Sequence, residues 1–147
     1  MAEKDYTSLL LRSQICFPLY ACSREIIKQY RPHLEALGLT YTQYITMMVV
    51  WEMQEISVKA LGQQLHLDSG TLTPVLKALE AKGLLTRRRS PEDERVLLVS
   101  VTEEGMALRE QALSVPRAMA GCARLTEDEA ATLYQLLYKL LDSTDME

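Results

Sequence analysis

The sequence is poor in residues that interrupt or stiffen a chain. Its 147 residues include 6 glycines and 5 prolines, and only one phenylalanine and one tryptophan. Few chain breakers, together with frequent leucine, alanine, glutamate and methionine, favour helices over a sheet-rich fold. The length suits one domain with a core of ordinary size.

Long apolar runs are also missing. The longest, ITMMVVW, is far shorter than the roughly 20 residues that a membrane-spanning helix needs. The first residues, MAEKDYTSLLLRSQ, lack the basic flank, the apolar run and the small-residue cleavage site of a secretion signal. We therefore expect a cytoplasmic protein that has no membrane partner.

Cysteine is scarce, and its count is odd. Cys16, Cys22 and Cys122 show neither metal-ligand spacing nor the even number of a secreted disulfide framework. His33 and His66 form no ligand cluster with them, so we expect no metal and no other cofactor. Each cysteine is either a small buried apolar residue or a reactive thiol, and composition alone favours burial.

Positive charge is in the minority, with a net charge of −4, but it gathers in the middle of the chain. Residues 57–100 carry seven lysines and arginines against five acidic residues, so this segment is +2 and the remainder −6. A basic segment in an acidic chain suits a nucleic-acid interface, although an ordinary solvated surface has the same composition.

Apolar periodicity predicts helices over most of the chain. The first is expected over about residues 6–30, with a kink at Pro18 and a separate helical turn after Pro32 that stops at Gly38. Between later helices, LLTRRR and RVLLVSV flank the polar turn SPEDE and indicate a two-stranded hairpin. Pro116 should interrupt the helix that follows. Polar caps are expected at Thr40 or Thr42, Ser57, Asp68, Thr102 and Thr126.

The order of these elements predicts a mainly α fold with a small β-hairpin. Two helices joined by a short turn and followed by a hairpin make a winged helix-turn-helix, over about residues 55–101 of a single domain that spans 1–147. The apolar helices over about residues 6–30 and 103–142 lie outside this unit and are not needed to form it. We expect them to form a homodimer interface.

The second helix of a helix-turn-helix enters the major groove with its first residues against the bases. The segment DSGTLTP supplies short hydroxyl side chains there, and a glycine that lets the backbone approach closely. Asp68 suits a helix cap better than a DNA contact. Pro74 fits a helix that begins near Gly70 or Thr71, and loses one backbone bond if the helix begins at Asp68. The residues expected to contact DNA are Ser69, Gly70, Thr71, Thr73, Pro74 and Lys77.

The hairpin carries basic residues toward its tip. Arg87, Arg88 and Arg89 approach the tip and Arg95 leaves it. An arginine there can enter the narrow minor groove, with Asp93 orienting its guanidinium. A plain charged hairpin held by local ion pairs is the alternative. The position of the hairpin directly after a helix-turn-helix favours a wing that contacts DNA.

Two stretches carry a family resemblance. LDSGTLTPVLKALEAKGLLTRRRSPEDERVLLVSVTEEG resembles the winged helix of the multiple antibiotic resistance regulator (MarR) family. Together with CFPLYACSREIIKQYRPHLEALGLTYTQY, it makes the chain similar over nearly its whole length to the organic hydroperoxide resistance regulators within that family. The resemblance implies a homodimeric repressor of palindromic double-stranded operator DNA. It also implies that an organic hydroperoxide oxidises a cysteine and so releases the DNA.

By this resemblance, Cys16 is the peroxide-reactive thiol, and Tyr30 and Tyr41 of the second subunit hydrogen-bond it. Phenol hydroxyls can donate hydrogen bonds to a thiolate, which is the nucleophilic form of cysteine. Tyr20, four residues after Cys16, shares its helix face. Apolar residues around the thiol would favour organic over inorganic peroxide, and the candidates are Phe17, Leu19 and Met47.

The resemblance also makes Cys122 the resolving cysteine, which attacks oxidised Cys16 of the other subunit to form an intersubunit disulfide. The alternative is a structural Cys122, with a small external thiol in its place. Cys22 lies about 9 Å from Cys16 along a helix and on another face, so we expect it to be a bystander.

Two other functions remain open at this point. A thiol peroxidase would use Cys16 and Cys122 catalytically, but an enzyme does not need a helix-turn-helix and a basic wing, so we expect no enzymatic activity. A MarR-type regulator that responds to a small phenolic ligand would bind its effector between the dimerisation helices and the winged unit. In that regulator, the cysteines would be incidental.

Overall fold

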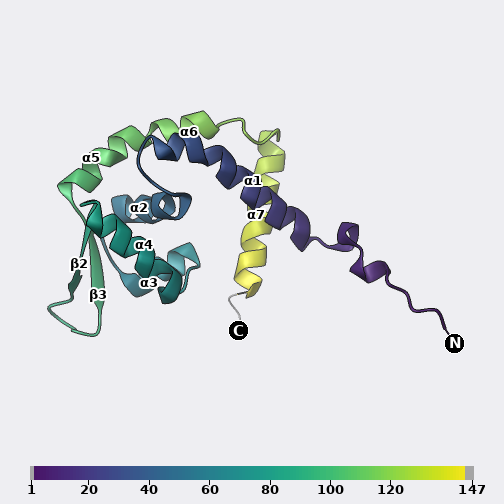
Figure 1. Ribbon diagram of the computed structural model, residues 1–147, viewed down its shortest axis with the longest axis horizontal. Coiled ribbons are helices and arrows are strands. Elements are labelled where there is room, and N and C mark those ends of the chain that lie inside the picture. The colour runs from purple at the N-terminus through teal and green to yellow at the C-terminus, as the bar shows by residue number, and fades with distance from the viewer. Residues whose placement is uncertain (1, 145–147) are drawn as a thin grey trace.

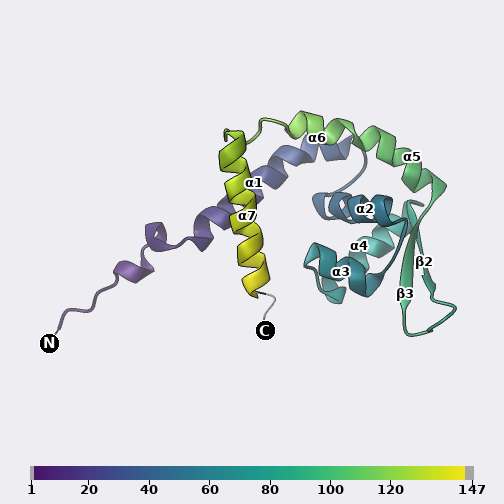
Figure 2. The ribbon, with the colours of Figure 1, turned by 180° about the vertical axis from the view of Figure 1, so that it is seen from behind.

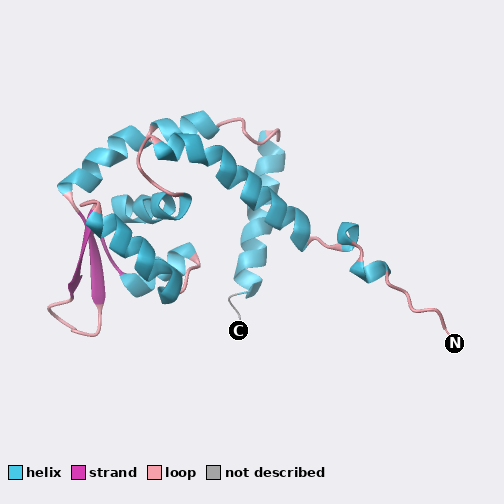
Figure 3. Cartoon of the chain, in the orientation of Figure 1, coloured by secondary structure: helices cyan, strands magenta, loops and turns pink. Residues whose placement is uncertain are grey.

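The computed structural model describes residues 2–144 and confirms the mainly α fold with a small antiparallel sheet (Figures 1 and 3). Helices form an arch over the winged unit, and the sheet lies at one end of the molecule. The elements, in chain order, are η1 (Thr7–Leu9), η2 (Leu11–Ser13), α1 (Cys16–Glu35), α2 (Tyr41–Met53), β1 (Glu55–Ser57), α3 (Val58–Leu65), α4 (Ser69–Ala81), β2 (Leu85–Arg89), β3 (Leu97–Val101), α5 (Glu103–Ala112), α6 (Ser114–Met119) and α7 (Glu127–Thr144).

The predicted hairpin is confirmed and has a third strand beside it. β2 and β3 pair antiparallel, with Leu85 opposite Val101 and Arg89 opposite Leu97. β1 pairs with the other edge of β3, which places Ile56 opposite Val99. The sequence did not predict β1 because three residues are too few for an alternating pattern, and pairing with β3 is what makes them a strand.

Polar caps delimit the helices as predicted. The Thr40 hydroxyl accepts a hydrogen bond from the backbone of Gln43, whose side chain accepts one from the Thr40 backbone in return. Similar caps are present at Ser57, Asp68, Thr102 and Thr126. Gly83 stops α4 with a φ of +76°, and the Leu84 N–H then bonds the Leu79 carbonyl at 3.1 Å. This left-handed turn directs the chain into β2.

The core fills the interior of the winged unit and extends through α2 to α1, α5 and α6. The Trp51 indole donates a hydrogen bond to the Gly105 carbonyl at 2.7 Å and so joins α2 to α5. Gly105 packs so closely on β2 that a Cβ there would lie 2.1 Å from the Leu84 carbonyl oxygen. The most completely buried apolar side chains are Leu34, Met47, Val50, Leu61, Leu72, Leu76, Leu79, Leu85, Val99 and Val115.

The predicted first helix is wrong at both ends. Residues 7–13 form two short 3-10 turns, and α1 begins at Cys16 and continues through Pro32 to Glu35. Pro18 therefore lies in the first turn of α1, where a backbone N–H has no partner within the helix. The proline costs nothing there, so the predicted kink at Pro18 is also wrong.

The predicted interruption at Pro116 is confirmed. α5 ends at Ala112 and α6 begins at Ser114, so the break falls at Leu113. A proline at position 116 cannot donate to the carbonyl four residues earlier, at Ala112. After the break, α6 continues the arch that α5 begins and packs against α1 (Figure 1).

α1 and α7 extend away from the winged unit, as both ribbon views show (Figures 1 and 2). No residue of α7 is buried, although it carries an apolar stripe in which Leu136 is 53% exposed. The chain exposes 11115 Å², whereas a compact monomer of 16.7 kDa exposes about 7,600 Å². Among the described residues 2–144, no helix has both the length and the apolar character to cross a membrane.

Candidate nucleic-acid interface and redox site

The recognition helix α4 begins at Ser69, one residue after its cap. The Asp68 carboxylate accepts a hydrogen bond from the Thr71 backbone at 2.7 Å, which lowers the pKa of Asp68. Asp68 thus caps α4, as expected. Because α4 begins at Ser69 with Asp68 as its cap, and not at Gly70 or Thr71, Pro74 lies inside the helix. One backbone hydrogen bond of α4 is therefore lost. Thr73 turns its hydroxyl onto the Ser69 carbonyl at 2.7 Å.

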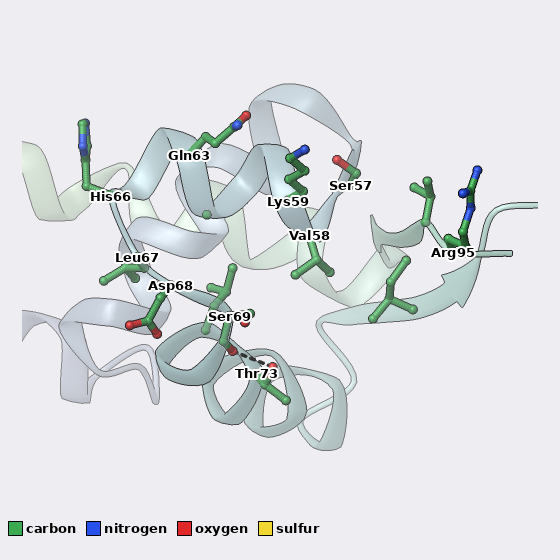
Figure 4. Close-up of a pocket in the computed structure, with 14 residues that line it drawn as sticks. Ser57, Val58, Lys59, Gln63, His66, Leu67, Asp68, Ser69, Thr73 and Arg95 are labelled. Atoms are coloured by element: carbon green, nitrogen blue, oxygen red, sulfur yellow. Dashed lines mark hydrogen bonds between the residues drawn. The ribbon is translucent and has the colours of Figure 1, made fainter. Parts of the chain in front are cut away.

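An open groove of about 1030 Å³ separates α3 from the start of α4 and the wing. Figure 4 shows Ser69 and Thr73 on one side, Lys59 on the other, and Arg95 at the wing. Lys59 and Gln63, both exposed, were not among the predicted DNA contacts. They lie on the first helix of the motif, which crosses the DNA backbone in helix-turn-helix proteins. The sequence signal for these two contacts is that Lys59 and Gln63 are polar and flank the buried Leu61 on the same helix.

The wing holds Arg95 in a fixed but exposed geometry. Its Nε lies 3.1 Å from Asp93 Oδ1, and its Nη2 lies 3.3 Å from Oδ2. The Arg95 backbone N–H also donates to Asp93, and these bonds lower the pKa of the Asp93 carboxyl. The Arg95 side chain is 90% exposed. Asp93 thus orients a guanidinium that stays available to a ligand outside the chain.

Two other wing arginines are held by the protein itself. Arg87 Nη2 lies 3.1 Å from Glu80 Oε1 on α4, and Arg88 Nη2 lies 2.8 Å from Glu55 Oε2 on β1. Glu55 also accepts a hydrogen bond from Ser100. The ion-pair alternative therefore describes Arg87 and Arg88, whereas Arg89 is exposed at the end of β2.

Three tyrosines gather where α1 meets α2. The Tyr30 ring centroid lies 5.1 Å from that of Tyr41 and 6.0 Å from that of Tyr44. Burial, and then the neighbouring Tyr30, raise the pKa of Tyr41 above its ordinary value of 10.0. Its hydroxyl therefore stays protonated at neutral pH and can donate a hydrogen bond. Tyr44 was not predicted, although its spacing from Tyr41 puts both on one helix face.

Cys16 is the first residue of α1 and is exposed. Tyr30 comes fourteen residues later on the same helix, about 21 Å along its axis. One chain therefore does not bring the thiol to the tyrosine pair. The beginning of a helix has positive potential, which favours an anionic group. Tyr20 lies one turn beyond Cys16, and its hydroxyl accepts a hydrogen bond from Arg24 at 3.2 Å.

The other two cysteines are also free and exposed. The burial that composition favoured is therefore wrong for all three. Cys122 lies between α6 and α7, next to Gly121 with its φ of +83°, and its N–H bonds the Met119 carbonyl at 3.1 Å. Cys22 lies within α1, six residues after Cys16 and about 9 Å from it along the helix.

The predicted apolar lining is present only in part. Phe17 is exposed beside Cys16, and Leu19 is partly exposed. Leu10 and Leu11 of the preceding turns form a shallow groove with Phe17. Met47 is fully buried in the core, so it cannot line a pocket that a peroxide reaches in this chain.

Sequence comparison places these features among transcriptional regulators. The family model described as transcriptional regulator SarA/Rot matches residues 28–111. The chain is 45% identical over 141 residues to the organic hydroperoxide resistance transcriptional regulator of Bacillus subtilis (strain 168), covering 96% of both chains. It is 39% identical over 142 residues to the HTH-type transcriptional regulator SarZ of Staphylococcus saprophyticus, covering 97% of this chain and 95% of that protein.

Solved structures give the same result. Reduced AbfR bound to DNA, from Staphylococcus epidermidis, matches with a TM-score of 0.75 and 34% identity over 91% of this chain and 94% of that one. The disulfide-formed AbfR matches with 0.64 and 34%, over 89% and 92%. A mutant MarR from E. coli in complex with operator DNA matches with 0.80 and 27%, over 94% and 99%. These proteins are regulators, not enzymes, which removes the thiol peroxidase alternative.

Proposed function

We propose that this chain, which belongs to the MarR family of transcriptional regulators and within it to the organic hydroperoxide resistance type, is a homodimeric repressor that peroxide switches off. Oxidation of Cys16 by an organic hydroperoxide would release its operator DNA. One observation carries the proposal: the exposed thiol begins α1, whereas Tyr30 lies about 21 Å away along the same helix, with Tyr41 of α2 beside it. Two chains side by side can bring the two parts together.

The exposed surface supports a dimer. The chain exposes about 3,500 Å² more than a compact monomer of its mass would. Permanent dimers bury about 1,000–2,500 Å² on each partner, so this excess is enough for such an interface. The apolar residues of α7 are the natural contact, because none of them is buried within the chain. The proposed dimerisation surface comprises Leu133, Leu136, Leu137, Leu140 and Leu141.

The winged unit supports binding to a palindromic site. Two copies related by a two-fold axis would place their α4 helices in major grooves about 34 Å apart. Ser69, Gly70, Thr71 and Thr73 are then the base and backbone contacts, with Lys77 at a phosphate one turn later. Arg95 would enter the adjacent minor groove, and Lys59 would meet the phosphate backbone from α3.

The chemistry at Cys16 needs only groups that the dimer supplies. The thiolate attacks one peroxide oxygen and the O–O bond breaks. This gives a sulfenic acid on Cys16 and an alkoxide that takes up a proton as an alcohol. Tyr30 and Tyr41 of the second subunit would donate hydrogen bonds to the thiolate through their phenol hydroxyls. The exposed Phe17 would favour an organic peroxide.

A second step would lock the oxidised state. The Cys122 thiolate of the other subunit attacks the sulfenic sulfur, a disulfide forms and hydroxide leaves as water. Cys122 is exposed in a linker with no regular helix, so it has room to move. The disulfide-formed AbfR is a precedent in a related protein. The bond would join the start of α1 to the α6–α7 linker and shift the two winged units relative to each other.

The test is operator binding measured by fluorescence anisotropy before and after an equimolar organic hydroperoxide. The reduced protein should bind and the treated protein should dissociate, whereas Cys16→Ser should bind in both conditions. Cumene hydroperoxide should act faster than hydrogen peroxide. Release of Cys16→Ser by peroxide would contradict the proposal.

One groove favours a second candidate, a small phenolic effector. It has a volume of about 300 Å³ and lies where α2 faces the break between α5 and α6. Tyr44, Met48, Trp51 and Leu113 supply apolar surface, and Arg109 supplies a positive charge for a phenolate or carboxylate. If this groove were the sensor, Cys16→Ser would still release DNA on addition of a phenolic acid.

A further inference from the structure

Lys82 joins the end of the recognition helix to the turn between α1 and α2. It is the C-terminal cap of α4. Its ammonium donates a hydrogen bond to the Gly38 carbonyl and another to the Gln43 side-chain oxygen at 3.0 Å. Both bonds are charge-assisted and directional, as is the Glu80–Arg87 pair of the same helix, and unlike the apolar contacts that α4 makes with the core. They fix the position of α4 relative to this turn.

The acceptors of Lys82 are themselves held in place. Gly38 ends α1 with a φ of +69°, and the Leu39 N–H bonds the Leu34 carbonyl across the turn at 3.0 Å. The Gln43 oxygen that accepts from Lys82 also accepts from the Thr40 backbone at 3.1 Å. Gln43 is only 8% exposed. A displacement of the turn would therefore move both acceptors together.

The same turn carries the tyrosine cluster. Tyr41 is the first residue of α2, and Tyr44 follows Gln43 directly. Their rings contact Tyr30 of α1 at centroid distances of 5.1 and 6.0 Å. Any rearrangement of these rings acts on the helical turn that holds Gln43, and so on Lys82.

We propose that Lys82 is the positioning residue that couples the tyrosine cluster to the recognition helix. A change at Cys16 of one subunit would reach α4 of the other through Tyr41, Gln43 and Lys82. The inference rests on the proposed function, because it takes Tyr30 and Tyr41 as the partners of Cys16. Lys82 lies thirteen residues after Ser69, about 20 Å along the helix, so it acts on DNA only through the placement of α4.

The test compares operator affinity in two redox states for four proteins. Lys82→Met removes the donors but keeps the apolar stem, and Lys82→Arg keeps donors and charge. Lys28→Met removes an exposed lysine of α1 whose ammonium lies 3.6 Å from Glu25 Oε1, and is the matched control. For each protein, Kd is measured on reduced dimer and on dimer oxidised by an organic hydroperoxide. Mass spectrometry confirms the modification of Cys16, and thermal unfolding reports stability.

In Lys82→Met, the ratio of oxidised to reduced Kd should be roughly five-fold smaller than in wild type, although Cys16 is oxidised equally. Lys82→Arg should recover most of the wild-type ratio, and Lys28→Met all of it. A purely structural role would lower the melting temperature and weaken both states alike. An unchanged ratio in Lys82→Met overturns the inference. A wild-type dimer that oxidation does not release overturns the proposed function and the inference with it.

Discussion

Glu80 and Arg87 fasten the recognition helix to the wing. Arg87 Nη2 lies 3.1 Å from Glu80 Oε1, and the Arg87 backbone N–H donates to Oε2 at 2.9 Å. The Arg87 side chain is only 20% exposed, so it is turned toward the protein. α4 and β2 therefore move as one unit, which matters for a protein whose helix and wing are proposed to enter adjacent grooves.

Breaking this pair should weaken DNA binding without removing a DNA contact. We predict that Glu80→Gln and Arg87→Met each reduce operator affinity, and that the double variant loses no more than the larger single loss. This non-additivity is expected of residues that act through one interaction. A double-mutant cycle measured by anisotropy tests it. Tighter binding by Glu80→Gln would contradict the prediction, because it would mean that Arg87 contacts DNA when its ion pair with Glu80 is removed.

The acidic side chains of the winged unit make its stability depend on pH. Hydrogen bonds from Arg87 hold the pKa of Glu80 below its ordinary value of 4.5, and those from Ser100 and then Arg88 lower that of Glu55. A folded-state pKa below the unfolded value gives stability that is present above pH 4.5 and is lost as pH falls through the lowered pKa. Urea unfolding between pH 7 and pH 3 should show this loss, and Glu80→Gln should flatten it. Equal acid sensitivity in Glu80→Gln would contradict the prediction.

The wing arginines should differ in their effect on DNA. Arg95→Ala should reduce operator affinity about ten-fold and lower the salt dependence of binding by about one ion, because its guanidinium is exposed and pre-oriented by Asp93. Arg88→Ala is the matched control, since Arg88 is paired with Glu55 and should cost less. Salt titrations of both variants test the order, and a larger loss in Arg88→Ala would reverse the assignment.

Substitution of two glycines, Gly83 and Gly70, should distinguish an effect on fold stability from an effect on DNA binding. Gly83 has a φ of +76°, and a Cβ there would lie 2.9 Å from Glu104 Oε2, so Gly83→Ala should destabilise the fold by about 1–2 kcal/mol. Gly70 is helical, and its nearest neighbour for a Cβ is Asp68 Oδ1 at 3.4 Å. Gly70→Ala should stabilise the fold by about 0.5–1 kcal/mol and yet weaken operator binding. Thermal unfolding and anisotropy on both variants test this, and unchanged binding by Gly70→Ala would remove Gly70 from the interface.

Local signals predicted much of the fold. The caps at Thr40, Ser57 and Asp68 depend on residues within three positions of each other, and the hairpin depends on one short turn. The apolar pattern predicts a helix that begins near Tyr6 and bends at Pro18, whereas Pro18 in fact lies in the first turn of α1. β1 was missed because it exists only by pairing with β3.

The candidate site was predictable in its chemistry but not in its partners. Nothing in the sequence near Arg87 shows that Glu80 faces it, and nothing near Lys82 points to Gly38, because these contacts depend on how distant helices pack. The thiol and the tyrosines were identified by resemblance. The packing of Tyr30 of α1 against Tyr41 and Tyr44 of α2 became evident only from the structure.

The most direct test of the account is the covalent state of the protein at the moment it leaves DNA. Reduced protein on its operator is treated with an equimolar organic hydroperoxide. The masses of the released and bound fractions are then measured by mass spectrometry under non-reducing, denaturing conditions. The released fraction is expected to be a covalent dimer linked through Cys16 and Cys122, and Cys16→Ser is expected to stay bound with the mass of a single chain. Release of a chain whose Cys16 is unmodified would contradict this expectation.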